Sequence, residues 1–186
     1  MPDKREVTAA LRLSKASLSK GMSDRELTRV EQRFGFRFAP DHRLMLQVAL
    51  PIGDKVWPDW RDGEEEDLRN RLNGPRDGVL FDVRENGFWR KDWGQRPGAL
   101  PDAVEVARGH LEQAPVLVPL FGHRFMPTVP ATPGNPVLSV HQTDIIYYGN
   151  DLLDWLAYEF TRSGSSELPS RRVPYWSDLM DEANEP

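Results

Sequence analysis

Histidines are the side chains of this chain best suited to acid–base catalysis or metal binding near neutral pH. The four are His42, His110, His123 and His141, and no two of them form an HxH, HExxH or HxxxH spacing. A metal site would need at least two of them beside a carboxylate. The best candidates for such a pocket are His123, His141 and Asp144, because His141 and Asp144 lie three residues apart near the end of an expected strand. The alternative is that each histidine is exposed or hydrogen-bonded without a chemical role.

Other catalytic constellations are missing from the sequence. The chain has no cysteine, which excludes disulfides, thiolate metal ligands and a thiol nucleophile. No Gly-x-Ser-x-Gly motif marks a serine nucleophile, and Gly74 and Gly78 lack the Lys-Ser/Thr ending of a phosphate-binding loop. The carboxylates of residues 64–67 fall on an expected exposed helix end, where nothing separates their pKa values. We therefore expect no catalytic residue, no metal and no cofactor.

Aromatic side chains are more informative, because the chain has six tryptophans and four of them fall in segments whose pattern indicates loops. Aromatic residues and arginine are enriched in the buried centres of protein interfaces. The alternative is that these rings cover small cores beneath the loops. Tyr147 and Tyr148 stand at a strand-to-helix junction and pose the same choice, since a core tyrosine can bond its hydroxyl to a turn. The expected partner-binding residues are Trp57, Trp60, Trp89, Trp93, Arg124, Tyr147 and Tyr148.

Net charge indicates the kind of partner. The formal charge is −5 and the isoelectric point is near 5.4, which argues against a general nucleic-acid binder, because such proteins need basic surface to displace counterions. An acidic surface suits a basic protein partner better. No apolar run approaches the length of a membrane span, and the first 20 residues lack the apolar segment of a secretory signal. We expect a cytoplasmic protein, and 186 residues predict one domain.

Two helices are predicted near the N-terminus. Ser23 and Glu26 have the spacing of a capping box, an apolar stripe follows, and Gly35 stands where a left-handed cap ends the first helix. Pro40 suits the first turn of a second helix, which we expect to end at Pro51 to Gly53. A weaker helical pattern precedes them in residues 1–20.

The rest of the chain predicts most of a sheet and a closing helix. Residues 64–72 indicate a short helix ended by Asn73-Gly74-Pro75, and residues 78–83 alternate like a strand. A helix from Pro101 to near Pro115 follows. Later strands are expected at 116–121, 125–129, 137–142 and 145–148, with a final core helix at 151–162. Residues 163–166 have the composition of a linker, and we expect the apolar side chains of the tail, residues 171–186, to dock on the domain. This order of elements predicts an α+β domain.

The stretch from Gly21 to Gly53 resembles the N-terminal signature of the SMI1/KNR4, or SUKH, superfamily. The matching features are a glycine, a Ser-capped helix carrying a Glu, the turn at Gly35 to Phe38, and a proline-led helix that starts Pro40-Asp41-His42-Arg43. The chain differs from the family after the second helix, where Ala49-Leu50-Pro51-Ile52-Gly53 replaces the usual Asn-Gly or Gly-Gly. Residues 116–160 resemble the C-terminal half of large bacterial members.

The resemblance implies an α+β fold of N-terminal helices packed with an antiparallel-dominated sheet and a closing C-terminal helix. Its domain would span residues 21–162, preceded by an arm or helix in residues 1–20 and followed by a linker and tail in residues 163–186. Bacterial members are commonly immunity proteins that bind and neutralise toxins, many of them nucleases. We therefore expect a non-catalytic protein-binding domain whose partner is a basic toxin domain; the alternative is a small enzyme or ligand-binding domain with a pocket at His123, His141 and Asp144.

Overall fold

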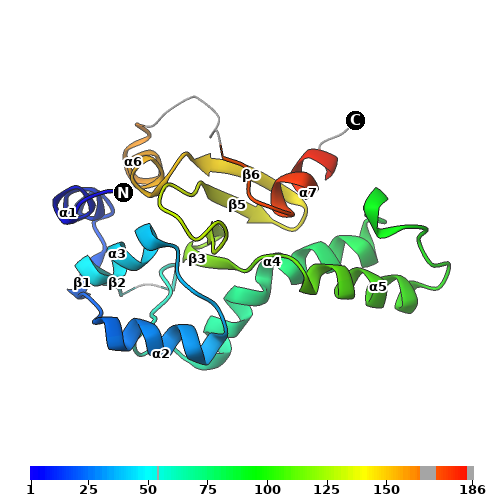
Figure 1. Cartoon of the computed structure of the whole chain (residues 1–186), viewed down its shortest axis with the longest axis horizontal. Helices are drawn as coiled ribbons and strands as arrows, with labels where there is room; N and C mark the ends of the chain where they lie inside the picture. The colour runs from blue at the N-terminus through cyan, green and yellow to red at the C-terminus, as the bar shows by residue number, and fades with distance from the viewer. Residues whose placement is uncertain (54, 164–170, 184–186) are drawn as a thin grey trace.

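The computed structural model describes residues 1–53, 55–163 and 171–183, which form an α+β fold (Figure 1). The helices within these ranges are α1 (Lys4–Leu13), α2 (Asp24–Phe34), α3 (Pro40–Val48), α4 (Glu65–Glu85), α5 (Leu100–Glu112), α6 (Leu152–Thr161) and α7 (Trp176–Ala183), with a 3-10 turn η1 at Lys91–Trp93. The strands are β1 (Ser17–Lys20), β2 (Ala49–Ile52), β3 (Leu117–Phe121), β4 (Arg124–Pro127), β5 (Val137–His141) and β6 (Asp144–Gly149).

The main sheet is an antiparallel meander in the order β3-β4-β5-β6. Its strands lie within two residues of the four that the sequence predicted in this region. Successive side chains of a strand point to opposite faces, and both faces are covered here. Val118 and Met126 pack in a first core, while their neighbours Leu117 and Phe125 pack in a second.

Different helices cover the two faces of this sheet. The first core gathers buried side chains of α1, α2, α3 and α6 together with Trp57 and Trp60. The second core gathers side chains of the later part of α4, of α5 and of α7. Figure 1 shows α4 and α5 extending away from the N-terminal helices, with α7 beside β6. The sheet is therefore shared by both cores.

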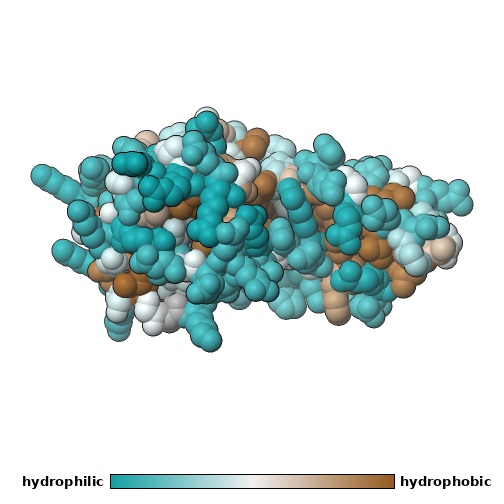
Figure 2. All heavy atoms as spheres, turned by 90° about the horizontal axis from the view of Figure 1, so that it is seen from below, coloured by the Kyte–Doolittle hydropathy of each residue, from teal (hydrophilic) through white to brown (hydrophobic). Residues whose placement is uncertain are grey.

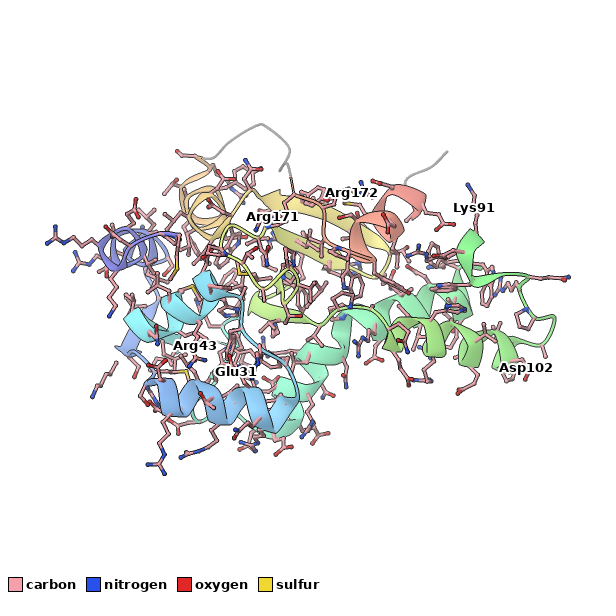
Figure 3. All side chains as sticks on the ribbon, in the orientation of Figure 1. Glu31, Arg43, Lys91, Asp102, Arg171 and Arg172 are labelled. Carbon is pink, nitrogen blue, oxygen red and sulfur yellow. The ribbon has the colours of Figure 1, made fainter. Side chains whose placement is uncertain are left out.

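The paired N-terminal helices form where the sequence predicted them. The Ser23 and Glu26 side chains make the reciprocal bonds of a capping box, and Gly35 ends α2 with a φ of +73°. Pro40 occupies the first turn of α3. Between the helices, Glu31 accepts a hydrogen bond from Arg43 at 3.0 Å (Figure 3). Helix α3 ends at Val48 rather than at Pro51, because residues 49–52 pair as β2 with β1.

Helix α4 corrects two sequence predictions, the short helix at 64–72 and the strand at 78–83. Both segments belong to one helix of 21 residues that runs through Pro75. Proline removes one backbone hydrogen bond from a helix, but an apolar stripe continues across it. Its members recur at spacings of three and four and are largely buried: Leu68, Leu72, Pro75, Val79 and Val83. Burial of this continuous face outweighs the local breaking signals.

Both ends of the chain pack on the domain. Helix α1 contacts α3 and α6, so residues 4–13 are part of the structure rather than a free arm. In the tail, Val173, Trp176 and Leu179 are buried in the second core. Arg171 ties the tail to the loop before β5 by donating to the Pro133 carbonyl at 2.7 Å. The predicted linker lies mostly outside the described residues. Within the described ranges, no helix has both the length and the apolarity needed to cross a bilayer.

Candidate functional site on strand β6 and helix α6

A surface of mixed aromatic and charged side chains lies where β6 meets α6, and we call it the α6–β6 face. It combines a buried arginine with exposed aromatic, aliphatic and cationic side chains. Its residues are Arg124, Ser139, Ile146, Tyr148, Tyr158, Glu159 and Arg162.

Sheet register sets the strand part of this face. Arg124 pairs with Ser139 across β4 and β5, and Ser139 pairs with Ile146 across β5 and β6. Residues directly opposite each other in a sheet point to the same side, so these three form a row. Tyr148 follows on β6 at a register irregularity between Tyr147 and Gly149, and its ring lies on the same face because the Arg124 guanidinium contacts it.

Arg124 is the fixed centre of the face. Its Nε donates to Glu159 of α6 at 2.8 Å and its Nη1 donates to the Ser139 hydroxyl at 2.8 Å. The guanidinium carbon lies 3.6 Å from the centre of the Tyr148 ring, a cation–π contact. Because Arg124 and Glu159 are both mostly buried, removal of either side chain would leave the other charge without its partner. The pair therefore holds α6 in place on the sheet.

Tyr148 connects this buried pair to the surface. Its hydroxyl accepts a hydrogen bond from Arg162 at 3.1 Å, and its ring meets Tyr158 edge to face with centroids 5.1 Å apart. Arg162 ends α6 in a left-handed conformation, with a φ of +59°, and this turns the chain so that its side chain returns over Tyr148. The Tyr148 and Arg162 side chains are thus held by specific contacts.

Apolar surface accompanies the charged groups. Ile146 is 45% exposed and Tyr158 is 37% exposed. Strand β6 is an edge strand of the sheet. An exposed aromatic and an aliphatic side chain beside fixed arginines form the composition that protein interfaces favour at their centres.

The residues of the alternative pocket lie at one end of the same sheet. His123 is in the turn between β3 and β4, and His141 pairs with Asp144 at the β5–β6 hairpin. Burial, followed by the Arg124 guanidinium, lowers the pKa of His123. All three side chains are nevertheless exposed, so they form an open surface rather than the concave, partly buried site that a pocket requires. Among the described residues, no group of three or more His, Cys, Asp or Glu is arranged to hold a metal ion.

Two of the predicted tryptophans belong to the first core. Trp57 is 4% exposed and packs on Phe121 with ring centroids 4.8 Å apart. Trp60 is 3% exposed and meets Phe38 edge to face. Their loop is therefore the cover of a core, the alternative that the sequence left open, and neither ring is available to a partner in this conformation.

The remaining aromatic candidates are divided between core and surface. Trp93 is buried and stacks on His110, while Trp89 is half-buried and donates to the Gly94 carbonyl at 2.8 Å. Tyr147 points away from the α6–β6 face, since its hydroxyl bonds to Ser177 of α7 at 2.6 Å. Of the seven predicted partner-binding residues, the structure places Arg124 and Tyr148 together.

Sequence reasoning missed the other members of the face, above all Ile146, Tyr158 and Arg162. A signal for them existed in the spacing. Residues 146 and 148 alternate on a predicted strand, and residues 158 and 162 are four apart in the segment predicted as the final helix. No family model, curated protein or solved structure matches this chain.

Proposed function

We propose that this chain is a non-catalytic protein-binding domain that uses the α6–β6 face to bind a basic partner protein. The observation that carries the proposal is the exposure of Ile146 and Tyr158 beside Arg124 and Tyr148, which are fixed by contacts on several sides. Tyrosine and arginine dominate the residues that contribute most to binding. Side chains ordered before binding lose less conformational entropy when a partner arrives.

Long-range charge supports a basic partner. Residues 63–186, which include the whole main sheet and α6, carry 20 Asp and Glu against 12 Lys and Arg. An excess of negative charge accelerates the approach of a positively charged protein. The apolar and aromatic groups of the α6–β6 face would then hold the complex once formed.

The resemblance to the SMI1/KNR4 superfamily suggests what this partner is. Under this proposal the chain is an immunity protein that neutralises a cognate toxin in the cytoplasm by direct binding, and the toxin carries a basic domain such as a nuclease. The resemblance rests on the capped helix α2, the turn at Gly35 and the proline-led helix α3. It supports the biological role, whereas the α6–β6 face supports the mode of binding.

The test is co-expression with the product of the neighbouring gene, followed by affinity measurement on the purified pair. We expect growth to be rescued by the wild-type chain. Ile146→Asp is expected to weaken binding about thirtyfold, the loss typical of a central interface residue. The matched control is Val106→Asp on α5, because Val106 is 38% exposed and Ile146 is 45% exposed.

Arg162→Gly provides a second variant that should keep the fold. Glycine adopts the left-handed backbone of this position without strain. Weaker binding by this variant would therefore come from the lost contacts that order Tyr148 and Tyr158, because the charge of Arg162 itself repels a basic partner. If Val106→Asp weakens binding and Ile146→Asp does not, the binding surface lies elsewhere. If the wild-type chain neither binds the neighbouring product nor relieves toxicity, the immunity role is wrong.

A further inference from the structure

The N-terminal third of this acidic chain is basic. Residues 1–62 carry twelve Lys and Arg against nine Asp and Glu, the reverse of the balance in the rest of the chain. Figure 2 shows the molecule from below, where hydrophilic side chains cover the part over α2 and more apolar ones appear over the α4 and α5 region. The basic part of the sequence contains α1, α2 and α3, whereas α4 and α5 belong to the acidic part.

A regular row of arginines runs along α2. Arg25, Arg29 and Arg33 recur at every fourth position, and Arg37 follows in the connector to α3. We call these four residues the α2 arginine row. All four are exposed.

Most of this charge is not used by the fold. Over residues 1–53, 55–163 and 171–183, Arg25, Arg29 and Arg37 form no ion pair, whereas Arg33 binds Glu65 of α4. Arg43, which faces α2 from α3, is different, since it is bonded to both Asp24 and Glu31. Inward arginines are thus neutralised, and three arginines of the row are left to the solvent.

The position of the row works against the stability of α2. Like charges four residues apart on a helix repel each other. Arg25 also lies in the first turn of α2, where the positive end of the helix dipole disfavours a cation. The charges of Arg25 and Arg29 therefore do not stabilise α2 electrostatically, and they remain available to a negatively charged ligand.

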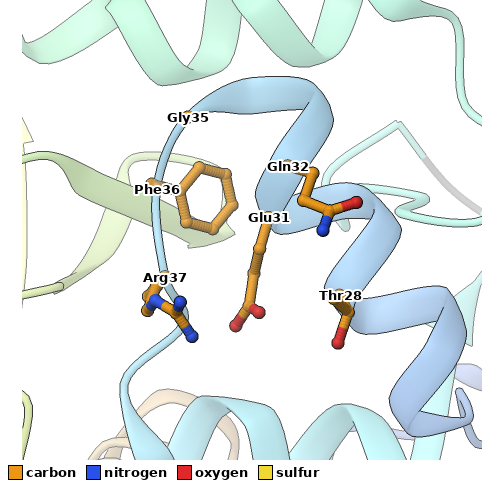
Figure 4. A pocket seen from close by; sticks show the side chains of 6 residues that line it. All are labelled: Thr28, Glu31, Gln32, Gly35, Phe36 and Arg37. Carbon is orange, nitrogen blue, oxygen red and sulfur yellow. The ribbon is translucent and has the colours of Figure 1, made fainter.

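Two shallow hollows lie beside the row and share Thr28 and Gln32. One is also lined by Glu31, Phe36 and Arg37 (Figure 4), and the other extends to the first two arginines of the row. The hollows also contain the carboxylates of Glu31 and Asp24, but these are already engaged with Arg43. In the described part of the chain, the unpaired charges around the hollows are therefore the cations of Arg25, Arg29 and Arg37.

We propose that the α2 arginine row binds an acidic helical segment of a partner protein. Every fourth position on a helix advances by about 6 Å, so an acidic helix lying along α2 with Glu or Asp at every fourth position offers one carboxylate each to Arg25 and Arg29. Arg37, in the connector beyond the end of α2, adds a third cation, unpaired among the described residues, for the same segment. Arginine pairs with carboxylates through two parallel hydrogen bonds. A long polyanion such as nucleic acid is disfavoured by the net charge of −5.

This surface is distinct from the α6–β6 face and has the opposite charge preference. It therefore extends the proposed function to a second class of partner and does not depend on the first.

The test uses the full chain and a fluorescein-labelled, alanine-based peptide of about 20 residues, long enough to form a helix, with glutamate at every fourth position. Binding is measured by fluorescence anisotropy. The row variant is Arg25→Gln/Arg29→Gln/Arg37→Gln. The matched control is Lys4→Gln/Arg5→Gln/Arg12→Gln, which removes the same charge from exposed positions of α1.

We expect the row variant to bind the peptide about tenfold more weakly, from the sum of three exposed ion pairs, and the α1 variant to bind within about twofold of wild type. The row variant should also unfold at the same or a higher temperature, because repulsion has been removed from α2. The thermal scan separates lost contacts from a damaged fold.

Several results would overturn the inference. Absence of peptide binding, or an equal loss in both variants, would show that the row makes no specific contact. Equal affinity for a peptide that carries the same number of glutamates in one consecutive block would show that the helical spacing of the carboxylates does not matter. Tighter binding of a single-stranded oligonucleotide of equal charge would assign the row to phosphates. If the wild-type chain self-associates, the row variant does not, and neither binds the peptide, the α2 arginine row would be assigned to contact with a second copy of the chain.

Discussion

His42, at the start of α3, is a deeply buried titratable side chain. It is 1% exposed and lies edge to face with Phe38. Burial lowers its pKa from 6.5 to about 3, because an imidazolium cannot be hydrated there. The unfolded chain therefore binds a proton at His42 between about pH 6.5 and 3 that the folded chain does not bind. Stability from this group is present above pH 6.5 and is lost as the pH falls through this window.

We predict that, in the middle of this window, His42 alone lowers the free energy of unfolding by about 1.4 kcal/mol for each unit by which the pH falls. His42→Leu should remove that slope, and urea unfolding at a series of pH values measures it. His141→Leu, at an exposed histidine, is the control. Asp41, whose pKa is raised by burial, has a slope of opposite sign, but it is present in wild type and in both variants. An unchanged difference between wild type and His42→Leu across the window would show that His42 is protonated in the fold.

Elements with strong local signals follow from the sequence. The capping box of α2 and the proline-led start of α3 depend on neighbouring residues, so both helices were predicted with nearly their observed bounds. Helix α4 was misassigned because Asn73-Gly74-Pro75 is a strong local break, while the compensating burial comes from α5 and the main sheet, which both follow later in the chain. Tertiary packing overrode local propensity there. Strands β1 and β2 have no strong local pattern, and neither was predicted.

Helix α4 also contains two glycines that should respond in opposite ways to the same substitution. A Cβ on Gly78 would lie 2.9 Å from the Gln142 Cα in the β5–β6 turn, whereas a Cβ on Gly74 would meet no other element within 4 Å. Gly74→Ala should therefore stabilise the protein through helix propensity, by less than about 1 kcal/mol because a Cβ on the residue before Pro75 offsets part of the gain. Gly78→Ala should destabilise it by about 1–3 kcal/mol, because the helix and the hairpin must move apart.

Chemical unfolding followed by circular dichroism measures both glycine variants under one set of conditions. The sign of each change in the free energy of unfolding is informative, since helix propensity alone predicts that alanine stabilises the protein at both positions. Stabilisation by Gly78→Ala would mean that α4 does not pack closely on the β5–β6 turn in solution.

At the scale of the whole molecule, the candidate site is a product of register and docking. Arg124 is 15 residues from Ser139 and 35 from Glu159, and no local pattern links them. The sequence identified Arg124 and Tyr148 by type, but it also selected Trp57 and Trp60, which the fold buries. Burial of an aromatic side chain in a loop depends on what packs above it, which single-sequence patterns do not contain. The charge difference between the two parts of the chain can be counted from the sequence, but only the fold shows which charges are unpaired.

The shared sheet predicts that the two cores unfold together. Trp176 of α7 is 1% exposed in the second core, and its ring nitrogen donates to the Pro115 carbonyl at 2.7 Å. Trp176→Ala should lower the free energy of unfolding by about 3–5 kcal/mol. Because each strand contributes to both cores, amide hydrogen exchange should accelerate in α3 and α6 by the same factor as in α5.

Leu100→Ala, at a 46% exposed position, is the control and should change stability by less than about 0.5 kcal/mol. Faster exchange confined to α4, α5 and α7 would show instead that the second core opens on its own, and the α6–β6 face would then rest on the first core alone.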